Sequence, residues 1–240
     1  MLIYGINPVM EALKAGRVRE LHVGPRGGDR MAQLLALASQ HGVRVIRVLP
    51  DVLDRESRHG VHQGVVARVD EPADYSVSDL IRAADGPALI VVLDGIEDPQ
   101  NVGAILRTCD AVGVHGVVVQ SRRSAALGGA VAKASAGALS HVRIAEVVNI
   151  ARAVEELKEA NVWTIGLAGE ARTPYTGIDF TSPSAIVLGA EGTGLRRLVR
   201  DRCDHLAAIP MLGHVNSLNV SVSAGVVLFE AVRQRASRRL

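Results

Sequence analysis

The first 69 residues alternate between helical and extended patterns of apolar positions. A first helix is predicted where Asn7 can serve as the N-cap, Pro8 can start the first turn and Gly16 can end it. A second helix is predicted over residues 29–41, and Gly42 ends it. Strands are predicted over residues 21–23, 43–48 and 64–69. This pattern predicts a small α/β unit with its own core.

The second half of the chain has short, continuous apolar runs in place of alternating ones. ALIVVL begins at residue 88, GVVV at residue 116 and AIVL at residue 185, and helical patterns separate them. Runs of this kind are typical of a parallel sheet that is covered by helices on both faces. We therefore predict an α/β fold with a parallel sheet over residues 88–240.

An acidic segment with prolines near both ends lies between the two patterns. Residues 70–87 have the sequence DEPADYSVSDLIRAADGP, which is typical of a linker that contains a short helix. The predicted organisation is a small α/β domain over residues 1–69, a linker over 70–87 and a larger domain over 88–240.

Composition narrows the class of protein. Apolar residues make up 48% of the chain but aromatic residues only 2%, so few rings are available to stack on bases, and a bound nucleic acid would be held by its backbone. Cys109 and Cys203 have neither the spacing of a metal site nor the density of a disulfide scaffold. This use of cysteine fits a reducing cytoplasm, and we expect no bound metal. Because no apolar run approaches the length of a membrane span, we also expect no insertion into a membrane.

Net charge gives weak evidence on partners, because a value of +2 falls short of that of a strongly basic nucleic-acid binder. The distribution of arginine is more informative. Four arginines gather in one segment and four near the end of the chain: Arg196, Arg197, Arg200 and Arg202, then Arg233, Arg235, Arg238 and Arg239. A guanidinium suits phosphate. A solvated basic face explains either cluster as well.

LDGIEDPQNVGAILRTCDAVG is the first of three segments with candidate chemistry. A buried strand is predicted to end at Leu93, and a helix to begin near Asn101. The apolar stripe of this helix consists of Val102, Ile105, Leu106, Cys109 and Val112. Arg107 points to nearly the opposite side, so packing does not require it. A solvated arginine and a capping asparagine are the ordinary interpretation of these two polar residues.

AIVLGAEGTGLRRLVRD places a glycine-rich turn between a core strand and a basic helix. Such a turn lets a ligand approach the backbone closely. No Lys-Ser/Thr pair follows, as a Walker loop requires, and Gly189, Gly192 and Gly194 lack the dinucleotide-binding spacing. Glu191 would repel an anion and attract a cationic ligand or a partner arginine. The turn is therefore either a tight structural turn or a loop for a ligand that is not a phosphate.

AAIPMLGHVNSLNVSVSAGVVLFEAVRQR is the third segment. A strand is predicted to end at Ile209, residues 210–213 turn the chain, and a polar cluster leads into the last helix. The predicted buried stripe of that helix consists of Val222, Val226, Phe229 and Val232. Ser217 as the N-cap explains one polar group but not the whole cluster, which comprises Asn216, Ser217, Asn219, Ser221 and Ser223.

NVGAILRT, GAEGTGLRR and IPMLGHVNSLNVSVSAG, in this order, resemble the three signature motifs of the SpoU/TrmH methyltransferases of the SPOUT class. The resemblance covers residues 88–240, and the YGINPVMEAL start resembles the small α/β RNA-binding domain that precedes the catalytic domain in many members. It implies a parallel α/β sheet whose C-terminal segment forms a deep trefoil knot. It also implies a homodimer that packs through the knotted region.

The resemblance further implies methyl transfer from S-adenosylmethionine to a ribose 2′-hydroxyl in RNA. It assigns Arg107 to activation of the hydroxyl, either with help from an RNA phosphate or as a protonated group that stabilises the developing alkoxide. Asn101 and Asn219 would position substrate and loops. Glu191 would orient Arg107 or the ribose, and Ser217 would order the final loop. The residues expected to bind the cofactor are Leu188, Gly189, Gly192, Ile209, Met211 and Leu218.

The N-terminal domain and the segment VNSLNVSVSAGVVLFEAVRQR resemble members that methylate a guanosine ribose in large-subunit (23S) ribosomal RNA. The expected partners are this RNA and a second copy of the chain, without DNA. Asn216 stands where some relatives carry serine. A tRNA ribose methyltransferase, a thiostrepton-resistance type enzyme acting on an rRNA adenosine, and an RNA-binding assembly factor without catalysis remain alternatives. A nicotinamide dehydrogenase is excluded by the glycine spacing and by the missing downstream acid.

Overall fold

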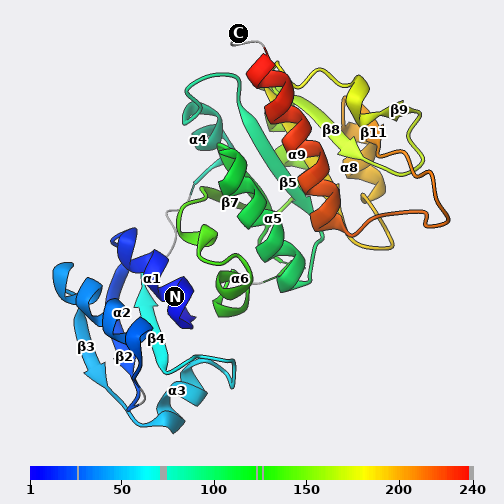
Figure 1. The fold of residues 1–240 in the computed structure, drawn as a ribbon. Coiled ribbons are helices and arrows are strands. Elements are labelled where there is room, and N and C mark those ends of the chain that lie inside the picture. The colour runs from blue at the N-terminus through cyan, green and yellow to red at the C-terminus, as the bar shows by residue number, and fades with distance from the viewer. Residues whose placement is uncertain (26, 71–74, 123, 126, 238–240) are drawn as a thin grey trace. The chain divides into compact units, whose positions relative to one another are not determined.

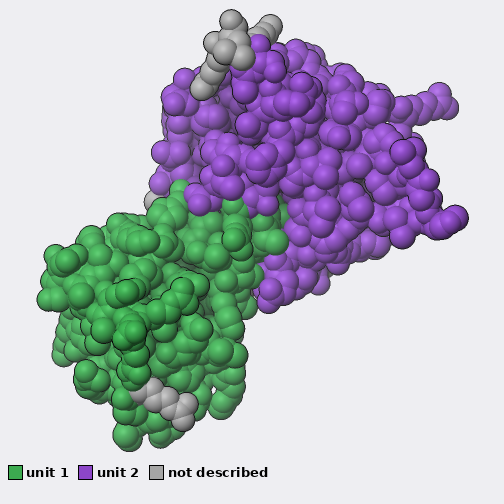
Figure 2. All heavy atoms as spheres, viewed as in Figure 1, with its two compact units in different colours: residues 1–72, 102–107, 126–141 green, residues 73–101, 108–125, 142–240 purple. Residues whose placement is uncertain are grey.

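The computed structural model describes residues 1–25, 27–70, 75–122, 124, 125 and 127–237. The chain forms two compact units (Figure 2): residues 1–72, 102–107 and 126–141 make up unit 1, and residues 73–101, 108–125 and 142–240 make up unit 2. Residues 71–74 of the predicted linker and the predicted basic residues Arg238 and Arg239 lie outside the described residues. The division into domains at residues 70–87 stays a prediction.

Unit 1 contains a four-stranded sheet with the order β1-β4-β2-β3. β1 (Leu2–Tyr4) and β2 (Val18–Val23) run antiparallel to β4 (Val65–Val69), while β3 (Arg44–Arg47) runs parallel to β2. The three strands that were predicted in this region are confirmed. The alternating pattern did not predict β1, because three residues are too short for a period of two to be recognised.

Helices complete unit 1: α1 (Ile6–Lys14), α2 (Asp29–Gln40), α3 (Pro50–Glu56), α6 (Gly129–Ala134) and the short 3-10 helix η1 (Ala138–Ser140). The predicted second helix is confirmed as α2, and α3 was not predicted. Within this unit α6 packs on β1, where a Cβ at Gly129 would lie 2.2 Å from the ring of Tyr4. Position 129 therefore needs glycine for close packing.

The predicted N-cap of the first helix is wrong. The helix α1 begins at Ile6, so Asn7 lies inside its first turn, and Gly5 is the N-cap residue with a φ of +94° that favours glycine. The Ile6 N–H donates to Oε1 of Gln63 at 3.0 Å. An amide 57 residues away thus satisfies the helix start, which local sequence does not reveal.

Unit 2 contains a seven-stranded sheet with the order β7-β6-β5-β10-β8-β11-β9 (Figure 1). Every pairing in it is parallel, which confirms the predicted parallel sheet. Its strands are β5 (Leu89–Asp94), β6 (Gly116–Gln120), β7 (Ile144–Val147), β8 (Trp163–Leu167), β9 (Thr173–Pro174), β10 (Ser184–Gly189) and β11 (His205–Ala208).

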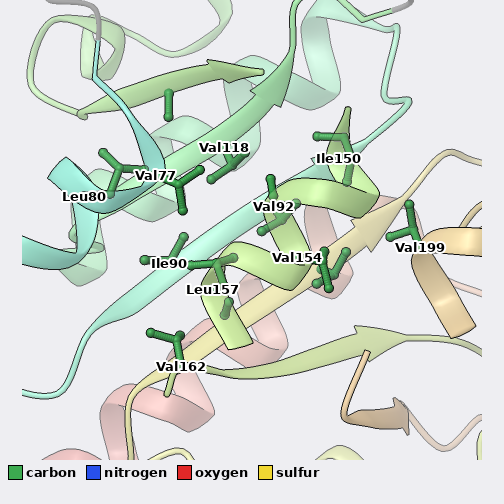
Figure 3. Close-up of a cluster of buried hydrophobic side chains, with 14 of the residues drawn as sticks. Val77, Leu80, Ile90, Val92, Val118, Ile150, Val154, Leu157, Val162 and Val199 are labelled. Atoms are coloured by element: carbon green, nitrogen blue, oxygen red, sulfur yellow. The ribbon is translucent and has the colours of Figure 1, made fainter. Parts of the chain in front are cut away.

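Helices α4, α7 and α8 cover one face of this sheet. Ile90 and Val92 of β5 pack in one buried cluster with Val154 and Leu157 of α7 (Figure 3), and each fully buried side chain of this size stabilises the fold by about 1.5–3 kcal/mol. The helices of unit 2 are α4 (Val77–Arg82), α5 (Pro99–Val112, part of which belongs to unit 1), α7 (Ile150–Glu159), α8 (Arg197–Arg202), α9 (Val220–Ser237) and the 3-10 turn η2 (Tyr175–Gly177). None of the helices in the described part of the chain combines the length and apolar content of a bilayer span.

The C-terminal helix α9, coloured orange to red in Figure 1, contacts β10 with a different face from the predicted one. Its buried residues are Val220, Ala224, Val227, Leu228 and Ala231. The predicted buried stripe is therefore wrong, because Val222 is 51% exposed and Phe229 is 57% exposed. Both faces of α9 are apolar, and the pattern of residues alone does not distinguish which one meets the sheet.

Arg235 holds the end of α9 against the segments that enter two central strands. Its guanidinium donates to the carbonyls of Phe180 at 2.8 Å, Pro87 at 2.6 Å, Ala88 at 2.9 Å and Ser182 at 3.2 Å. Burial lowers the pKa of Arg235. Because this charged group donates to several carbonyls, its removal should lower the free energy of unfolding.

We expect Arg235→Met to lower the free energy of unfolding by about 2–3 kcal/mol, because several carbonyls lose a charged donor. Urea denaturation followed by circular dichroism measures this loss. The matched control is Arg82→Met, in which a 72% exposed arginine loses only its contact with Asp79 and about 0.5 kcal/mol of stability. Equal losses in the two variants would show that Arg235 does not anchor the helix.

Candidate functional site

A pocket of about 560 Å³ lies where three neighbouring strands of the parallel sheet end. β8, β10 and β11 are contiguous in the sheet, and the residues at and after their carboxyl ends line the pocket together with the segment that leads into α9. In open α/β sheets, ligands bind at this edge. The volume is that of a small-molecule site.

Every residue predicted to bind the cofactor lines this pocket: Leu188, Gly189, Gly192, Ile209, Met211 and Leu218. They come from the ends of β10 and β11 and from the segment before α9. The structure therefore brings together residues from two predicted motifs that are separated in the sequence. Their individual contacts with a cofactor stay predictions.

Asn219 connects all three motifs. Its side-chain Nδ2 donates to Oδ1 of Asn101 at 2.9 Å and to Oε1 of Glu191 at 2.5 Å. Its Oδ1 accepts from the backbone N–H of Ser221 at 2.9 Å and from the Ser221 hydroxyl at 2.5 Å. Both amide protons and the amide oxygen are thus used. Three of the predicted catalytic residues meet at one side chain.

Asn219 also starts α9, so the predicted N-cap is wrong here too. Its Oδ1 accepts from Ser221 N–H, and its backbone carbonyl accepts from Ser223 N–H at 2.9 Å, which is the geometry of an N-cap. Ser217 lies two residues earlier, in an exposed segment, and it lines the pocket. The hypothesis that Ser217 orders this segment stays untested.

Asn101 is not a cap either. The helix α5 begins at Pro99, and Asp98 caps it by accepting a hydrogen bond from Gln100 N–H at 3.0 Å. Asn101 is buried, with 6% exposure, and its recorded partner is Asn219. Burial of a polar side chain away from a capping position indicates that it holds the start of α5 to the segment before α9.

Arg107 lies on the exposed side of α5, as predicted. The predicted stripe on the other side is buried at Val102, Ile105, Leu106 and Cys109, and Val112 is half-buried. Among the described residues, the guanidinium of Arg107 forms no hydrogen bond or ion pair. Arg107 belongs to unit 1 and the pocket to unit 2. The residue is thus available for a role other than packing.

The glycine turn is tight as well as being part of the pocket wall. A Cβ on Gly189 would lie 2.2 Å from the carbonyl carbon of Gly194 and 2.3 Å from the nitrogen of Leu195, so the turn folds back over the end of β10. Gly192 has a φ of +78°, in the left-handed region that favours glycine. The turn can therefore be a tight structural turn and also a loop that contacts a ligand.

The charged groups that line the pocket are acidic. Glu170 and Glu191 lie in its wall, and no lysine, arginine or histidine is found among its described lining residues. Because Glu170 is paired with Arg200, the negative potential of this wall comes mainly from Glu191, which disfavours a phosphate group and favours a cationic ligand. No group of His, Cys, Asp and Glu in the described residues could hold a metal ion.

The basic segment after the glycine turn consists of ion pairs. Each of its arginines lies near a carboxylate: Arg196 near Asp94, Arg197 near Asp201 at 3.6 Å, Arg200 near Glu170 at 2.5 Å and Arg202 near Glu155 at 2.9 Å. The phosphate-binding interpretation of this cluster is therefore weakened, because each guanidinium already has an acidic partner.

Asp94, the last residue of β5, was not among the residues predicted from the sequence. Its side chain is fully buried and accepts hydrogen bonds from the backbone N–H and the side-chain Nε of Arg196, at 2.8 Å and 2.6 Å. The available signal was an acid that directly follows the buried run LIVVL. A buried carboxylate at a strand end beside a pocket is a candidate for a functional contact.

Comparison with known proteins identifies relatives along nearly the whole chain. Residues 88–229 match the sequence model of the SpoU rRNA Methylase family, and residues 2–75 match that of RNA 2′-O ribose methyltransferase substrate binding. The chain is 45% identical over 240 residues to the 23S rRNA (guanosine-2′-O-)-methyltransferase RlmB of Yersinia pestis, with 98% of this chain and 97% of that protein covered. It is 43% identical over 241 residues to RlmB of Escherichia coli K12, with 98% and 99% covered.

Solved structures show the same relationship. One of them is the SpoU methyltransferase AviRb from Streptomyces viridochromogenes in complex with the cofactor AdoMet. It superposes with a TM-score of 0.82 at 29% identity, and the match covers 99% of this chain and 91% of the AviRb chain. The A. aeolicus TrmH/SpoU tRNA modifying enzyme gives a TM-score of 0.57 at 29% identity over 68% of this chain and 84% of its own. The chain belongs to the SpoU rRNA methylase family.

Proposed function

We propose that this chain transfers the methyl group of S-adenosylmethionine to the 2′-hydroxyl of a guanosine ribose in 23S rRNA. The observation that carries the proposal is the convergence of three signature motifs on Asn219 beside a pocket at the ends of parallel strands. The RlmB relatives, which are 23S rRNA guanosine methyltransferases, align with nearly the whole chain.

The pocket residues fit this cofactor. When bound, S-adenosylmethionine would supply a methyl group on a positively charged sulfur. The ribose 2′-oxygen would form a bond to that methyl carbon, the carbon–sulfur bond would break to leave a neutral thioether, and the hydroxyl proton would pass to water. The carboxylate of Glu191 provides negative potential for such a cation, whereas that of Glu170 is already paired with Arg200. Apolar side chains such as Leu188 and Ile209 provide surface for the adenosyl part. A phosphate-bearing cofactor would meet only carboxylates among the charged lining residues.

The remaining residues position the acceptor and help it react. The guanidinium of Arg107 stabilises the negative charge that develops on the ribose oxygen. Asn101 and Asn219 hold the segments around the reacting atoms in alignment, since an in-line displacement depends on orientation. Glu191 orients the ribose or Arg107, and Ser217 orders the segment before α9.

Alignment lengths favour ribosomal RNA over tRNA as the substrate. The RlmB relatives align with 98% of the chain, including the substrate-binding region over residues 2–75, whereas the tRNA modifying enzyme aligns with 68%. We assign RNA binding to the N-terminal domain on this basis. An enzyme with this substrate would act in the cytoplasm, where ribosomes are assembled.

The exposed face of α9 supports a homodimer. Val222 and Phe229 are more than half exposed, Val226 and Val232 are partly exposed, and Leu218 lies just before the helix with 37% exposure. Burial of such a stripe against a second copy would remove apolar surface from water. We assign the dimer interface to this stripe.

We propose that the C-terminal segment forms a trefoil knot. Its support is the insertion of β10 between β5 and β8, the anchoring of α9 by Arg235, and the similarity to AviRb. Tracing the chain in a crystal structure tests it. A path that can be pulled straight from its two ends would contradict it.

Incubation of the purified chain with methyl-labelled S-adenosylmethionine and protein-free 23S rRNA is expected to label the 2′-oxygen of a guanosine ribose. Mass spectrometry of digested RNA identifies the modified nucleoside, and total tRNA serves as the parallel substrate. Label on a base, on tRNA alone or on adenosine would contradict the proposal, and binding of rRNA without any label would favour an assembly factor.

Arg107→Ala is expected to keep the fold but reduce turnover by about 10²–10³-fold, because the side chain lies off the buried stripe and acts on developing charge. Circular dichroism and single-turnover methylation measure the two effects. Arg152→Ala, which removes an exposed arginine from α7, is the matched control and should keep full turnover. Normal turnover by a folded Arg107→Ala protein would remove this residue from the mechanism.

Phe229→Asp is expected to convert the dimer to a monomer, since a carboxylate would lie in the centre of the apolar stripe on α9. Analytical ultracentrifugation of the full chain measures the mass. Val148→Asp, which places the same charge at a valine that is 80% exposed elsewhere in unit 2, should leave the dimer intact. A monomeric wild-type chain, or a dimeric Phe229→Asp variant, would refute the assignment.

A further inference from the structure

We propose that Asp94 and Arg196 form an anchor that fixes the glycine turn, residues 189–195, in the shape that the cofactor pocket requires. Both are then positioning residues for methyl transfer. The inference rests on the proposed function, because the turn matters for the reaction only if the pocket binds the methyl donor. Arg196 lies within the motif GAEGTGLRR, but the resemblance assigns a role neither to it nor to Asp94.

The anchor is formed by one buried carboxylate and one residue that follows the turn. Asp94 ends β5, where it pairs in register with Gly189 of β10, and its side chain has no exposed surface. Its Oδ2 accepts the backbone N–H of Arg196 at 2.8 Å, and its Oδ1 accepts Nε–H at 2.6 Å. The guanidinium Nη2 also lies against Oδ1. Main chain and side chain of Arg196 are thus held by the same group.

The turn is restrained at both ends. Gly189 belongs to the ladders of β10, and Arg196 is held by Asp94 of the neighbouring strand. Between them, Gly194 N–H donates to the carbonyl of Ala190 at 2.9 Å, which closes the turn on itself. Because the backbone of Gly194 lies directly over Gly189, the turn has little room to shift while the anchor is intact.

The position of this turn determines the site. Gly192 and Thr193 line the pocket, and Glu191 accepts the hydrogen bond from Asn219. If Arg196 is lost, Asp94 becomes a buried carboxylate without its charged partner, a state that proteins relieve by rearranging or by admitting water. The nearest segment that can rearrange is the turn itself. The pocket wall would then change shape, and Glu191 would move relative to the Asn219 side chain that donates to it.

Arg197 provides a matched comparison. It is adjacent to Arg196 and of the same type, but its side chain is 95% exposed and its ion pair is with Asp201 of its own helix at 3.6 Å. An exposed pair of this kind contributes little. A variant at position 197 therefore removes an arginine charge from the same segment without touching the anchor.

The experiment compares Asp94→Asn, Arg196→Gln, the double variant, Arg196→Lys and the control Arg197→Gln in the full chain. Hydrogen exchange measured by mass spectrometry on a peptide that covers residues 189–196, without cofactor, reports on the turn directly. Calorimetry with S-adenosylmethionine gives affinity, and steady-state methylation gives the Michaelis constants for cofactor and RNA separately.

We expect faster exchange in this peptide for Asp94→Asn and Arg196→Gln, with the peptides of β8 and α7 unchanged. The Michaelis constant for the cofactor should rise roughly tenfold, because residues in contact are commonly coupled by energies that correspond to about this change. The Michaelis constant for RNA should stay within about twofold. The double variant should lose no more than the larger single loss. Arg196→Lys should recover part of the affinity, and Arg197→Gln should behave as wild type.

Wild-type exchange and cofactor affinity in a folded Arg196→Gln protein would overturn the inference, and so would an equal effect of Arg197→Gln. If Asp94→Asn does not fold, the half-exposed Arg196 still carries the test. Absence of S-adenosylmethionine binding by the wild-type chain would refute the proposed function instead. The exchange of the turn would then still decide whether the anchor exists.

Discussion

The hydrogen bonds of the Asn219 side chain are the contact on which the site depends. They connect the start of α5, the glycine turn and the start of α9, three segments that the sequence separates by many residues. The parallel sheet makes this possible, because the carboxyl ends of its strands face the same edge, and each motif follows a strand at that edge. Three of the residues with proposed catalytic roles are thereby brought together by hydrogen bonds.

Electrostatics gives the pocket its selectivity. Glu170 and Glu191 lie in the pocket wall, and the arginines that follow the glycine turn are paired with carboxylates, one of which is Glu170. The buried carboxylate of Asp94 extends this arrangement beneath the turn and takes up the charge of Arg196. In the proposed reaction, a cationic methyl donor meets negative potential in a site with no basic lining residue among those described.

Sequence patterns predicted the α/β class, the parallel sheet and most strands, because each buried strand is a continuous apolar run. They failed where the partner of a group lies far along the chain. Gln63 satisfies the start of α1, so Asn7 was the wrong cap, and Asp94 was missed because its partner is 102 residues away. The stripe containing Val222 and Phe229 was placed in the core because periodicity shows that a face is apolar but not which surface it contacts.

A crystal structure of the chain with S-adenosylmethionine tests the central claim most directly. The adenosyl group is expected to lie between the ends of β10 and β11, against Leu188 and Ile209, with the sulfonium on the side of Glu191 and with Asn219 still bonded to Asn101. Electron density for the cofactor outside this pocket, or an Asn219 side chain turned away from both Asn101 and Glu191, would contradict it.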